Sequence, residues 1–194
     1  MPSVPKTSQE AIVAAARDLI DTGGLAALSV QAVAQSVGVQ APSLYKRFRD
    51  RAALIRAVAA ELVSELDETI RLAATTGTPQ GDLRALAHTQ RAFAQRSPHL
   101  YQLVFNPSGV DGELDPDEYR PLVAVLVDRM RALVGKRDAL PAARLLVSFT
   151  HGFVTMELGR AFRMGGDLDA AFRFGLERVL ASVTPVAKKR TPKK

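Results

Sequence analysis

Residues 29–54 contain two short helix-like apolar patterns separated by one glycine, and this stretch constrains the fold more than any other part of the chain. Val30, Val33, Ala34 and Val37 are spaced as i, i+3, i+4 and i+7, which predicts a first helix with a single apolar face. Gly38 then breaks the pattern. A helix that ends at a glycine turn is therefore predicted for the first half of the stretch.

The second half predicts another helix, beginning within residues 40–42. A proline at position 42 is compatible with a first helical turn, where its missing N–H has no partner in any case. Leu44, Tyr45 and Phe48 give this helix an apolar side. Its other side is polar and cationic, formed by Gln40, Ser43, Lys46 and Arg47. Two short helices joined by a glycine turn, the second with a cationic outer face, are typical of a helix-turn-helix that places its second helix in the DNA major groove.

A further helix precedes this pair. Thr7 and Glu10 fit a capping box, and an apolar stripe follows that ends at Gly23 and Gly24. The stripe consists of Ile12, Ala15, Ala16, Leu19 and Ile20. We expect this helix to brace the other two.

The order and spacing of these residues resemble the DNA-binding domain of the TetR family of transcriptional regulators over about residues 7–56. The resemblance is carried by Leu28, Ser29, Val30, Ala34, Val37, Gly38, Val39, Leu44, Tyr45, Phe48 and Leu54. It implies that Ser29 and Gln31 meet phosphates or groove edges, and that Arg51 meets phosphate. Base contacts are expected from Gln40, Pro42, Ser43 and Lys46, and backbone contacts from Tyr45 and Arg47. Arg51 stands where the family usually has lysine, which keeps the charge but changes the donor geometry.

The composition excludes several classes of protein and of site. A chain of 194 residues with 47% hydrophobic content can bury a large core and has room for one small module and one larger domain. It has no cysteine, which rules out disulfides, thiolate metal sites and a cysteine nucleophile. The beginning of the chain has no apolar leader, and the longest apolar run, residues 122–127, is too short to span a bilayer. We therefore expect a cytoplasmic protein with no membrane partner.

The net charge of +6 is concentrated at the end of the chain. Five of the 26 basic residues lie in the last seven positions, so the rest of the chain carries 21 basic against 20 acidic residues. Residues 185–194 are expected to form a disordered basic tail, which either attracts phosphate non-specifically or only solubilises the chain. A better-placed cationic cluster lies on and just after the second helix of the pair, at Lys46, Arg47, Arg49, Arg51 and Arg56.

The remainder of the chain predicts only helices, because no segment alternates with period two. Helices are expected over residues 51–74, 83–96, 98–105, 116–134, 140–164 and 168–182, with a loop over residues 75–82. The predicted fold is all-α. It consists of a three-helix DNA-binding domain at residues 1–50 and a larger helical domain at residues 51–184 that binds an effector and dimerises.

Residues 106–117 are rich in proline and glycine and carry four acids, Asp111, Glu113, Asp115 and Asp117. Their spacing does not match a calcium-binding loop. We expect a hydrated surface loop.

A second resemblance lies later in the chain. Phe149, His151, Gly152, Phe153 and the residues after them resemble the regulatory domain of TetR-like proteins that have a His-Gly signature. Two roles for His151 stay open: it lines a small-molecule cavity, or it donates to a carbonyl where helices cross at a close-packing Gly152.

The resemblance also implies an effector pocket between helices. Candidate lining residues are Phe93, Phe105, Leu126, Met130, Phe149, Phe153 and Met156, with His88 and Glu157 as polar groups. A mostly apolar lining would suit a small hydrophobic effector. In the family the last two helices pair with their copies in a homodimer, and here the candidate interface residues are Leu145, Phe172, Leu176, Val179, Leu180 and Val183.

No catalytic or metal-binding arrangement is visible, and no cofactor is expected. His88, His99 and His151 are far apart and lack metal-ligand spacing, and no phosphate-binding or nucleophile motif is present. The chain is therefore interpreted as a regulator, most simply a repressor, that binds palindromic double-stranded DNA as a homodimer and is released by an effector. A DNA-binding regulator without small-molecule control is the first alternative, and an all-helical enzyme is the second.

Overall fold

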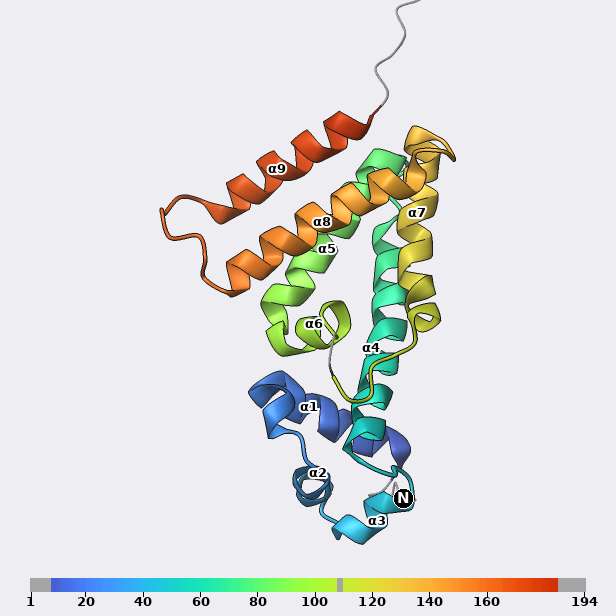
Figure 1. Ribbon diagram of the computed structural model, residues 1–194, viewed down its shortest axis with the longest axis vertical. Helices are drawn as coiled ribbons and strands as arrows, with labels where there is room; N and C mark the ends of the chain where they lie inside the picture. The colour runs from blue at the N-terminus through green and yellow to red at the C-terminus, as the bar shows by residue number, and fades with distance from the viewer. Residues whose placement is uncertain (1–7, 108–109, 185–194) are drawn as a thin grey trace, which may run out of the picture. The chain divides into compact units, whose positions relative to one another are not determined.

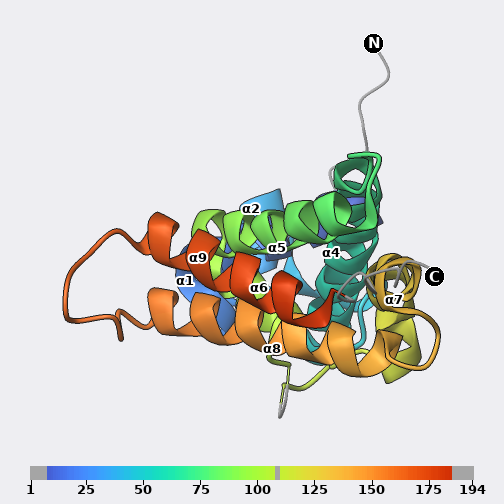
Figure 2. The same ribbon diagram turned by 90° about the horizontal axis from the view of Figure 1, so that it is seen from above.

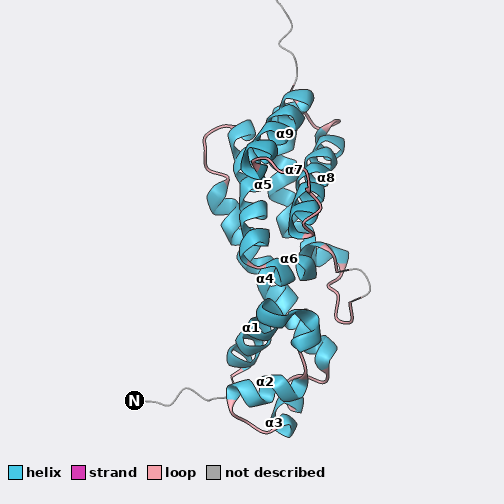
Figure 3. Cartoon of the chain, turned by 90° about the vertical axis from the view of Figure 1, so that its left-hand side faces the viewer, coloured by secondary structure: helices cyan, strands magenta, loops and turns pink. Residues whose placement is uncertain are grey.

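The computed structural model describes residues 8–107 and 110–184, and every regular element within these ranges is helical (Figure 3). The elements are α1 (Gln9–Ala27), α2 (Val30–Val37), α3 (Ala41–Tyr45), α4 (Arg51–Ala73), α5 (Pro79–Arg96), α6 (Pro98–Phe105), a 3-10 helix η1 (Pro116–Tyr119), α7 (Arg120–Val134), α8 (Ala139–Leu158) and α9 (Leu168–Val183). The predicted all-α class is confirmed. None of the described helices is long and apolar enough to cross a membrane. The basic tail expected at residues 185–194 lies outside the described residues.

By packing, the chain forms two compact units, each built from separate parts of the sequence. The first unit contains the residues up to Thr69 together with Ala92–Leu122. The second contains Ile70–Arg91 and the residues from Val123 onward. Both units are discontinuous in the sequence. The functional domains expected at residues 1–50 and 51–184 stay a prediction.

The first unit packs α1, α2 and α3 around the start of α4 (Figure 1). Its core contains residues of the predicted α1 stripe, of which Ile12, Ala16 and Ile20 are fully enclosed. Val33 from α2 and Leu44 from α3 are also fully enclosed in it. Helix α6 packs directly on α1. There His99 Nδ1 lies 2.9 Å from the carbonyl oxygen of Asp21.

Helix α1 differs from its prediction at both ends. Ser8 is its N-cap, because the Ser8 hydroxyl accepts from the N–H of Ala11 at 3.1 Å; the predicted cap Thr7 lies outside the described residues. Gly24 does break the helix, with φ 68° and ψ −174°, but the chain resumes a helical turn and continues to Ala27. The glycine is therefore a kink and not an end.

Other boundaries also differ from the prediction. Helix α5 begins at Pro79, within the expected loop 75–82, because proline is favoured in a first helical turn. Helix α3 ends at Tyr45 and not near Phe48. Residues 116–134 are divided between η1 and α7. Helix α8 ends at Leu158, six residues early, because Arg160 takes a positive φ of 51° and the chain turns there.

The second unit has a core formed by α5, α7, α8 and α9. Its buried residues are Leu83, Ala87, Met130, Ala142, Ala143, Leu146, Phe172, Leu176 and Leu180. Figure 2 shows α8 and α9 running side by side with α5 next to them. The close approach of α8 and α9 depends on Gly175, because a Cβ there would lie 2.5 Å from the ring of Phe149. Gly152 was the expected close-packing glycine, but a Cβ at that position would meet nothing within 4 Å.

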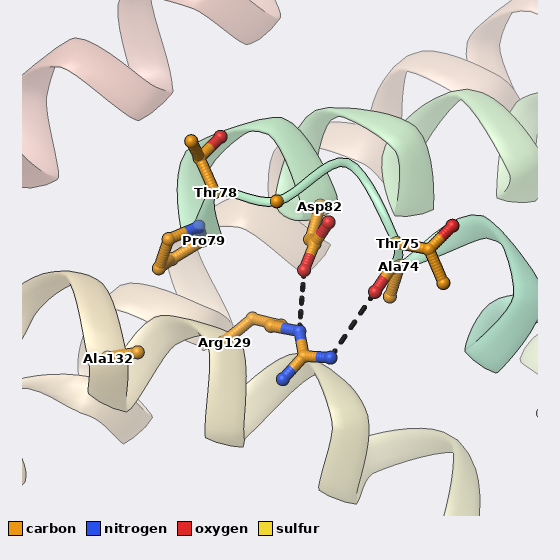
Figure 4. A pocket seen from close by; sticks show the side chains of 8 residues that line it. Ala74, Thr75, Thr78, Pro79, Asp82, Arg129 and Ala132 are labelled. Carbon is orange, nitrogen blue, oxygen red and sulfur yellow. Dashed lines mark hydrogen bonds and ion pairs between the residues drawn. The ribbon is translucent and has the colours of Figure 1, made fainter.

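A pocket of about 360 Å³ lies where α4 ends and α5 begins, and α7 lines its opposite side (Figure 4). Asp82 and Arg129 form an ion pair across it at 2.7 Å, and Thr76 donates to Asp82 from its N–H and its hydroxyl. Burial alone would raise the pKa of Asp82, but the hydrogen bonds from Thr76 and the charge of Arg129 outweigh it, so the pKa is lowered. This network fixes the α4–α5 corner on α7.

Candidate nucleic-acid interface

The glycine-hinged pair is formed by α2 and α3, as predicted. Ser29 begins α2 as its N-cap and accepts from the N–H of Ala32 at 3.0 Å. Gly38 ends it in the left-handed region, with φ 73° and ψ 37°, and its N–H bonds back to the carbonyls of the last turn. A side chain at position 38 would be strained in this conformation, which explains why the turn has glycine.

Helix α3 divides its residues between the core and the surface. Leu44 is fully enclosed and Phe48, just beyond the helix, is 5% exposed, so these two apolar side chains hold the helix on the core. The opposite side is open to solvent and presents Gln40, Pro42, Tyr45, Lys46 and Arg47, with Ser43 half-buried at its edge. The structure thus brings the predicted base-contacting and backbone-contacting residues to one exposed side.

The start of α2 adds two polar side chains. Ser29 and Gln31 are both exposed. The Ser29 oxygen is the acceptor in the helix cap, and its hydroxyl proton is not used in that bond. Both side chains carry donors of the kind that a phosphate contact requires, and that contact stays a prediction.

Arg51 has a role that the sequence did not indicate. Its Nε donates to the carbonyl of Leu28 at 2.9 Å, and its Nη2 donates to the carbonyl of Leu25. These carbonyls belong to the end of α1 and the turn before α2, and the Leu25 carbonyl also accepts from the N–H of Leu28 at 3.3 Å. Arg51 therefore ties the first turn of α4 to α1, whereas the sequence predicted only a phosphate contact.

Asp50 is a second residue that sequence reasoning missed. Its carboxylate accepts from the N–H of Ala53 at 2.8 Å, which caps α4, and from Nε of Arg49 at 2.8 Å. The backbone hydrogen bond and then the Arg49 contact hold the pKa of Asp50 below its usual value. An aspartate directly before an apolar helical stripe is a recognisable start signal, and it could have been used here.

The candidate effector residues fall in both units, and each group packs within its own unit. In the first unit, Phe93 and Phe105 lie on either side of Tyr101, with ring centroids 6.3 and 4.7 Å from it. In the second unit, Phe149 and Phe153 surround Phe172 at 5.7 and 5.2 Å.

A buried cation lies against two rings of this second cluster, those of Phe153 and Phe172. The Arg91 guanidinium lies 4.9 Å from the centroid of Phe172 and forms a bidentate pair with Glu157, at 2.6 and 2.8 Å. Asp169 adds a third contact at 2.7 Å. Glu157, expected as a polar group for an effector, is thus bound to Arg91. Of the other candidates, Met130 is enclosed, Leu126 is half-buried, and His88 and Met156 are exposed.

The candidate dimer residues also divide into two groups. Phe172, Leu176 and Leu180 are 0% exposed and pack inside the chain's own core. Their assignment to a dimer interface stays a prediction. Val179 and Val183 are half-buried against the same core, and Leu145 is 46% exposed. Other apolar side chains on the surface of these helices are Met156 and Phe174, which are 46% and 64% exposed.

His151 is half-buried on α8, and its two predicted roles stay open. Within the described ranges, no group of three or more acidic or histidine side chains could hold a metal ion.

The chain matches two family models. Residues 12–58 match the model described as bacterial regulatory proteins, tetR family, and residues 83–179 match the model described as tetracyclin repressor-like, C-terminal domain. Neither match assigns the chain to a His-Gly subgroup, which stays a prediction.

Similar proteins are found among curated sequences and solved structures. An uncharacterised HTH-type transcriptional regulator, YobS, of Bacillus subtilis is 24% identical over 177 residues, covering 91% of this chain and 92% of YobS. A protein of unknown function from Rhodococcus sp. RHA1 superposes with a TM-score of 0.77 at 20% identity, covering 90% of this chain and 93% of that one. A TetR variant from Acinetobacter baumannii AYE, solved in complex with minocycline, has a TM-score of 0.63 at 22% identity and covers 91% and 96%.

The two matched models together span both the helix-turn-helix and the helices of the second unit, and they describe regulators and not enzymes. The chain belongs to the TetR family of transcriptional regulators.

Proposed function

We propose that this regulator binds a palindromic operator as a homodimer, represses transcription there, and is released by a small hydrophobic effector. The observation that carries the proposal is the exposed side of α3, where Tyr45, Lys46 and Arg47 project from a helix whose other side is fixed by Leu44. One such helix reaches only a few base pairs. Two copies about 34–36 Å apart would read both halves of a palindrome in successive major grooves.

The dimer is the part of the proposal that supplies this spacing. Support comes from the apolar side chains on the outer surface of α8 and α9, namely Leu145, Met156 and Phe174. Gly152 lies between the first two on α8 with open space above it, so a helix of a second copy could approach closely there. These surface residues take the place of the enclosed ones that the sequence favoured.

Effector release is supported by one relative and by the chemistry of the second unit. The Acinetobacter protein binds minocycline. In this chain the rings of Phe149, Phe153 and Phe172 provide apolar and aromatic surface of the kind that lines ligand pockets. Because its proposed ligand is operator DNA, we expect the protein to act in the cytoplasm.

A regulator without small-molecule control remains the second candidate, and one observation favours it. Arg91 lies against the rings of Phe153 and Phe172 and pairs with Glu157, and these two charged side chains are 8% and 14% exposed. An effector at this position would have to part the pair or displace the rings. If mass spectrometry identifies a co-purified small molecule, that result would support effector control and count against this second candidate.

The DNA-binding proposal is tested with duplexes selected by the purified protein from a random pool. Lys46→Ala and Tyr45→Ala should each weaken binding about tenfold or more in fluorescence anisotropy at fixed salt, because each removes a groove or backbone contact. Lys136→Ala is the matched control, since Lys136 is an exposed lysine of the second unit. Equal affinities for all four proteins would refute the assignment of α3.

A further inference from the structure

The segment between α6 and α7 contacts the first turns of α4, although the sequence predicted only a hydrated loop there. Residues 110–118 form a strap that packs on α4 within the first unit (Figure 1). Gly112 is its closest point of approach. It has a φ of 87°, and a Cβ built on it would lie 2.2 Å from the carbonyl oxygen of Ala52 and 3.0 Å from the carbonyl carbon. The strap therefore packs backbone against backbone, at a place where only glycine fits.

Arg56, one turn after Ala52 on the same side of α4, holds the strap by hydrogen bonds and charge. Its Nη1 donates to the carbonyl of Glu113 at 2.8 Å, and its Nη2 contacts the carboxylates of Asp115 at 3.3 Å and of Glu118. Such charge-assisted contacts from a rigid guanidinium fix direction as well as distance. Arg56, which the sequence placed in the cationic cluster for DNA, is thus held by the strap.

The strap has its own internal support, which makes it a firm partner for α4. The Glu118 carboxylate also accepts from the N–H of Asp115 at 2.9 Å, in the capping box that begins η1. Leu114, in the middle of the strap, is only 3% exposed. The Glu118 carboxylate therefore belongs to the capping box at the end of the strap and also accepts a hydrogen bond from Arg56.

On its other side, the start of α4 is tied to the helix-turn-helix. Arg51 donates to the carbonyls of Leu25 and Leu28, and Asp50 caps the helix directly after the chain leaves α3. The first two turns of α4 thus lie between the strap and the end of α1. We propose that the strap is a positioning element for the recognition helix α3, with Gly112, Arg56 and Glu118 as its positioning residues.

This proposal rests on the DNA-binding function. When α4 is not held in place, α3 samples more orientations, so the bound orientation carries a larger entropic cost and dissociation is faster. No phosphate contact is lost, so the dependence of affinity on salt concentration keeps its slope.

The experiment uses the full chain, a duplex selected by the wild-type protein, and the variants Gly112→Ala and Glu118→Gln. Both should weaken binding about tenfold through faster dissociation, with the salt slope unchanged. Gly135→Ala is the matched control for backbone strain, because Gly135 has a φ of 86° and a Cβ at that position would meet nothing within 4 Å. Asp117→Asn is the control for strap charge, because Asp117 pairs with Arg120.

Hydrogen exchange provides a readout that does not depend on DNA. Amides 55–60 bond to carbonyls of the first turns of α4, so they should exchange faster in both strap variants, while amides 62–66 stay protected. If wild-type protein selects no duplex, the proposed function fails, and the exchange data still show whether the strap holds α4.

Three results would overturn the proposal: faster exchange at amides 55–60 with unchanged affinity, equal losses in the strap variants and the two controls, or a gain in affinity with a steeper salt slope. The last result would mean that the strap withholds Arg56 from phosphate.

If Gly112→Ala does not fold, Arg56→Lys replaces it. This variant keeps the positive charge but should bind the duplex more weakly than the wild type. Wild-type affinity for Arg56→Lys would equally contradict the proposal. Arg56→Gln combined with Glu118→Gln should lose no more than Arg56→Gln alone, because Arg56 also holds Glu113 and Asp115.

Discussion

Arg51 illustrates how one residue can combine a structural role with a place in a cationic cluster. Arg51 stands at the start of a long helix and next to candidate DNA-binding residues, and that position indicated a phosphate contact. Sequence spacing shows which residues are close to Arg51 along the chain. It does not show which carbonyl acceptors lie within reach of its guanidinium in the fold. The carbonyls of Leu25 and Leu28 lie within reach of Arg51 where α1, kinked at Gly24, ends at Ala27. That geometry depends on tertiary packing and has no signature in the sequence.

We predict that Arg51→Ala lowers the free energy of unfolding by about 1.5–3 kcal/mol, because two carbonyls lose hydrogen bonds from a charged donor. Urea denaturation monitored by circular dichroism measures this loss. Arg49→Ala is the control: the Arg49 side chain is 88% exposed and pairs only with the neighbouring Asp50, so its loss should cost less than about 1 kcal/mol. Similar losses for the two variants would show that the Arg51 contacts contribute little.

At the scale of the helices, the sequence predicted the elements well and their close contacts poorly. Gly38 was correctly identified as the hinge because its local pattern is sufficient: apolar spacing stops there and the turn needs a positive φ. Gly152 was expected to pack closely because it follows His151 on an apolar helix, yet it has open space. The close contact of α8 with α9 instead lies where the Phe149 ring meets Gly175, and periodicity alone cannot show which glycine stands at that contact.

The two glycines form a matched pair for a stability measurement. Gly175→Ala should lower the free energy of unfolding by about 1–3 kcal/mol, because its Cβ would overlap the Phe149 ring that packs between α8 and α9. Gly152→Ala should raise it by about 0.5–1 kcal/mol, since alanine favours a helix interior and no atom is displaced. Urea unfolding at one protein concentration compares them. A neutral Gly175→Ala would contradict the α8–α9 packing described above, whereas a destabilising Gly152→Ala would indicate that a partner helix occupies the open space at that position.

For the whole molecule, charge is arranged along the contact of α5 with α8 and α9. Arg84 pairs with Glu177, Arg91 pairs with Glu157 and Asp169, and His88 lies between the two arginines on α5 with its ring edge-on to Phe172 at 5.4 Å. Partial burial, then Arg91, Arg173 and Arg84, lower the pKa of His88, while Glu177 opposes them. The folded protein therefore favours the neutral imidazole.

This arrangement predicts the direction in which stability depends on pH. In the unfolded chain His88 binds its proton with a pKa of about 6.5, and in the folded chain only at lower pH. Between these two values the unfolded state holds more protons, so the His88 contribution is fully present above about pH 6.5 and is lost as the pH falls. His88→Gln should lose less stability than the wild type between pH 7.5 and 5.5 in urea titrations. An equal loss in both proteins would exclude His88 as the source.

The organisation into two units also explains which features around the candidate nucleic-acid interface the sequence could not predict. The three helices at residues 9–45 were predictable because their contacts are local in sequence. The contact of the strap with α4 was not predictable from the sequence. Arg56, its partner on α4, is nearly 60 residues away along the chain, and the acidic residues of the strap have the composition of an ordinary hydrated loop. Only the fold shows that residues distant along the chain share one packing unit with the helix-turn-helix.

The discontinuity of the first unit, with α6 lying on α1, limits how such a protein can be rearranged by recombination. A single crossover after α4 would transplant α1, α2 and α3 without the helix that covers α1, and would leave apolar surface uncovered in the chimera. Exchange of DNA specificity between relatives of this architecture should therefore proceed by substitutions on the surface of α3, or by two coordinated breakpoints that carry the later segment along.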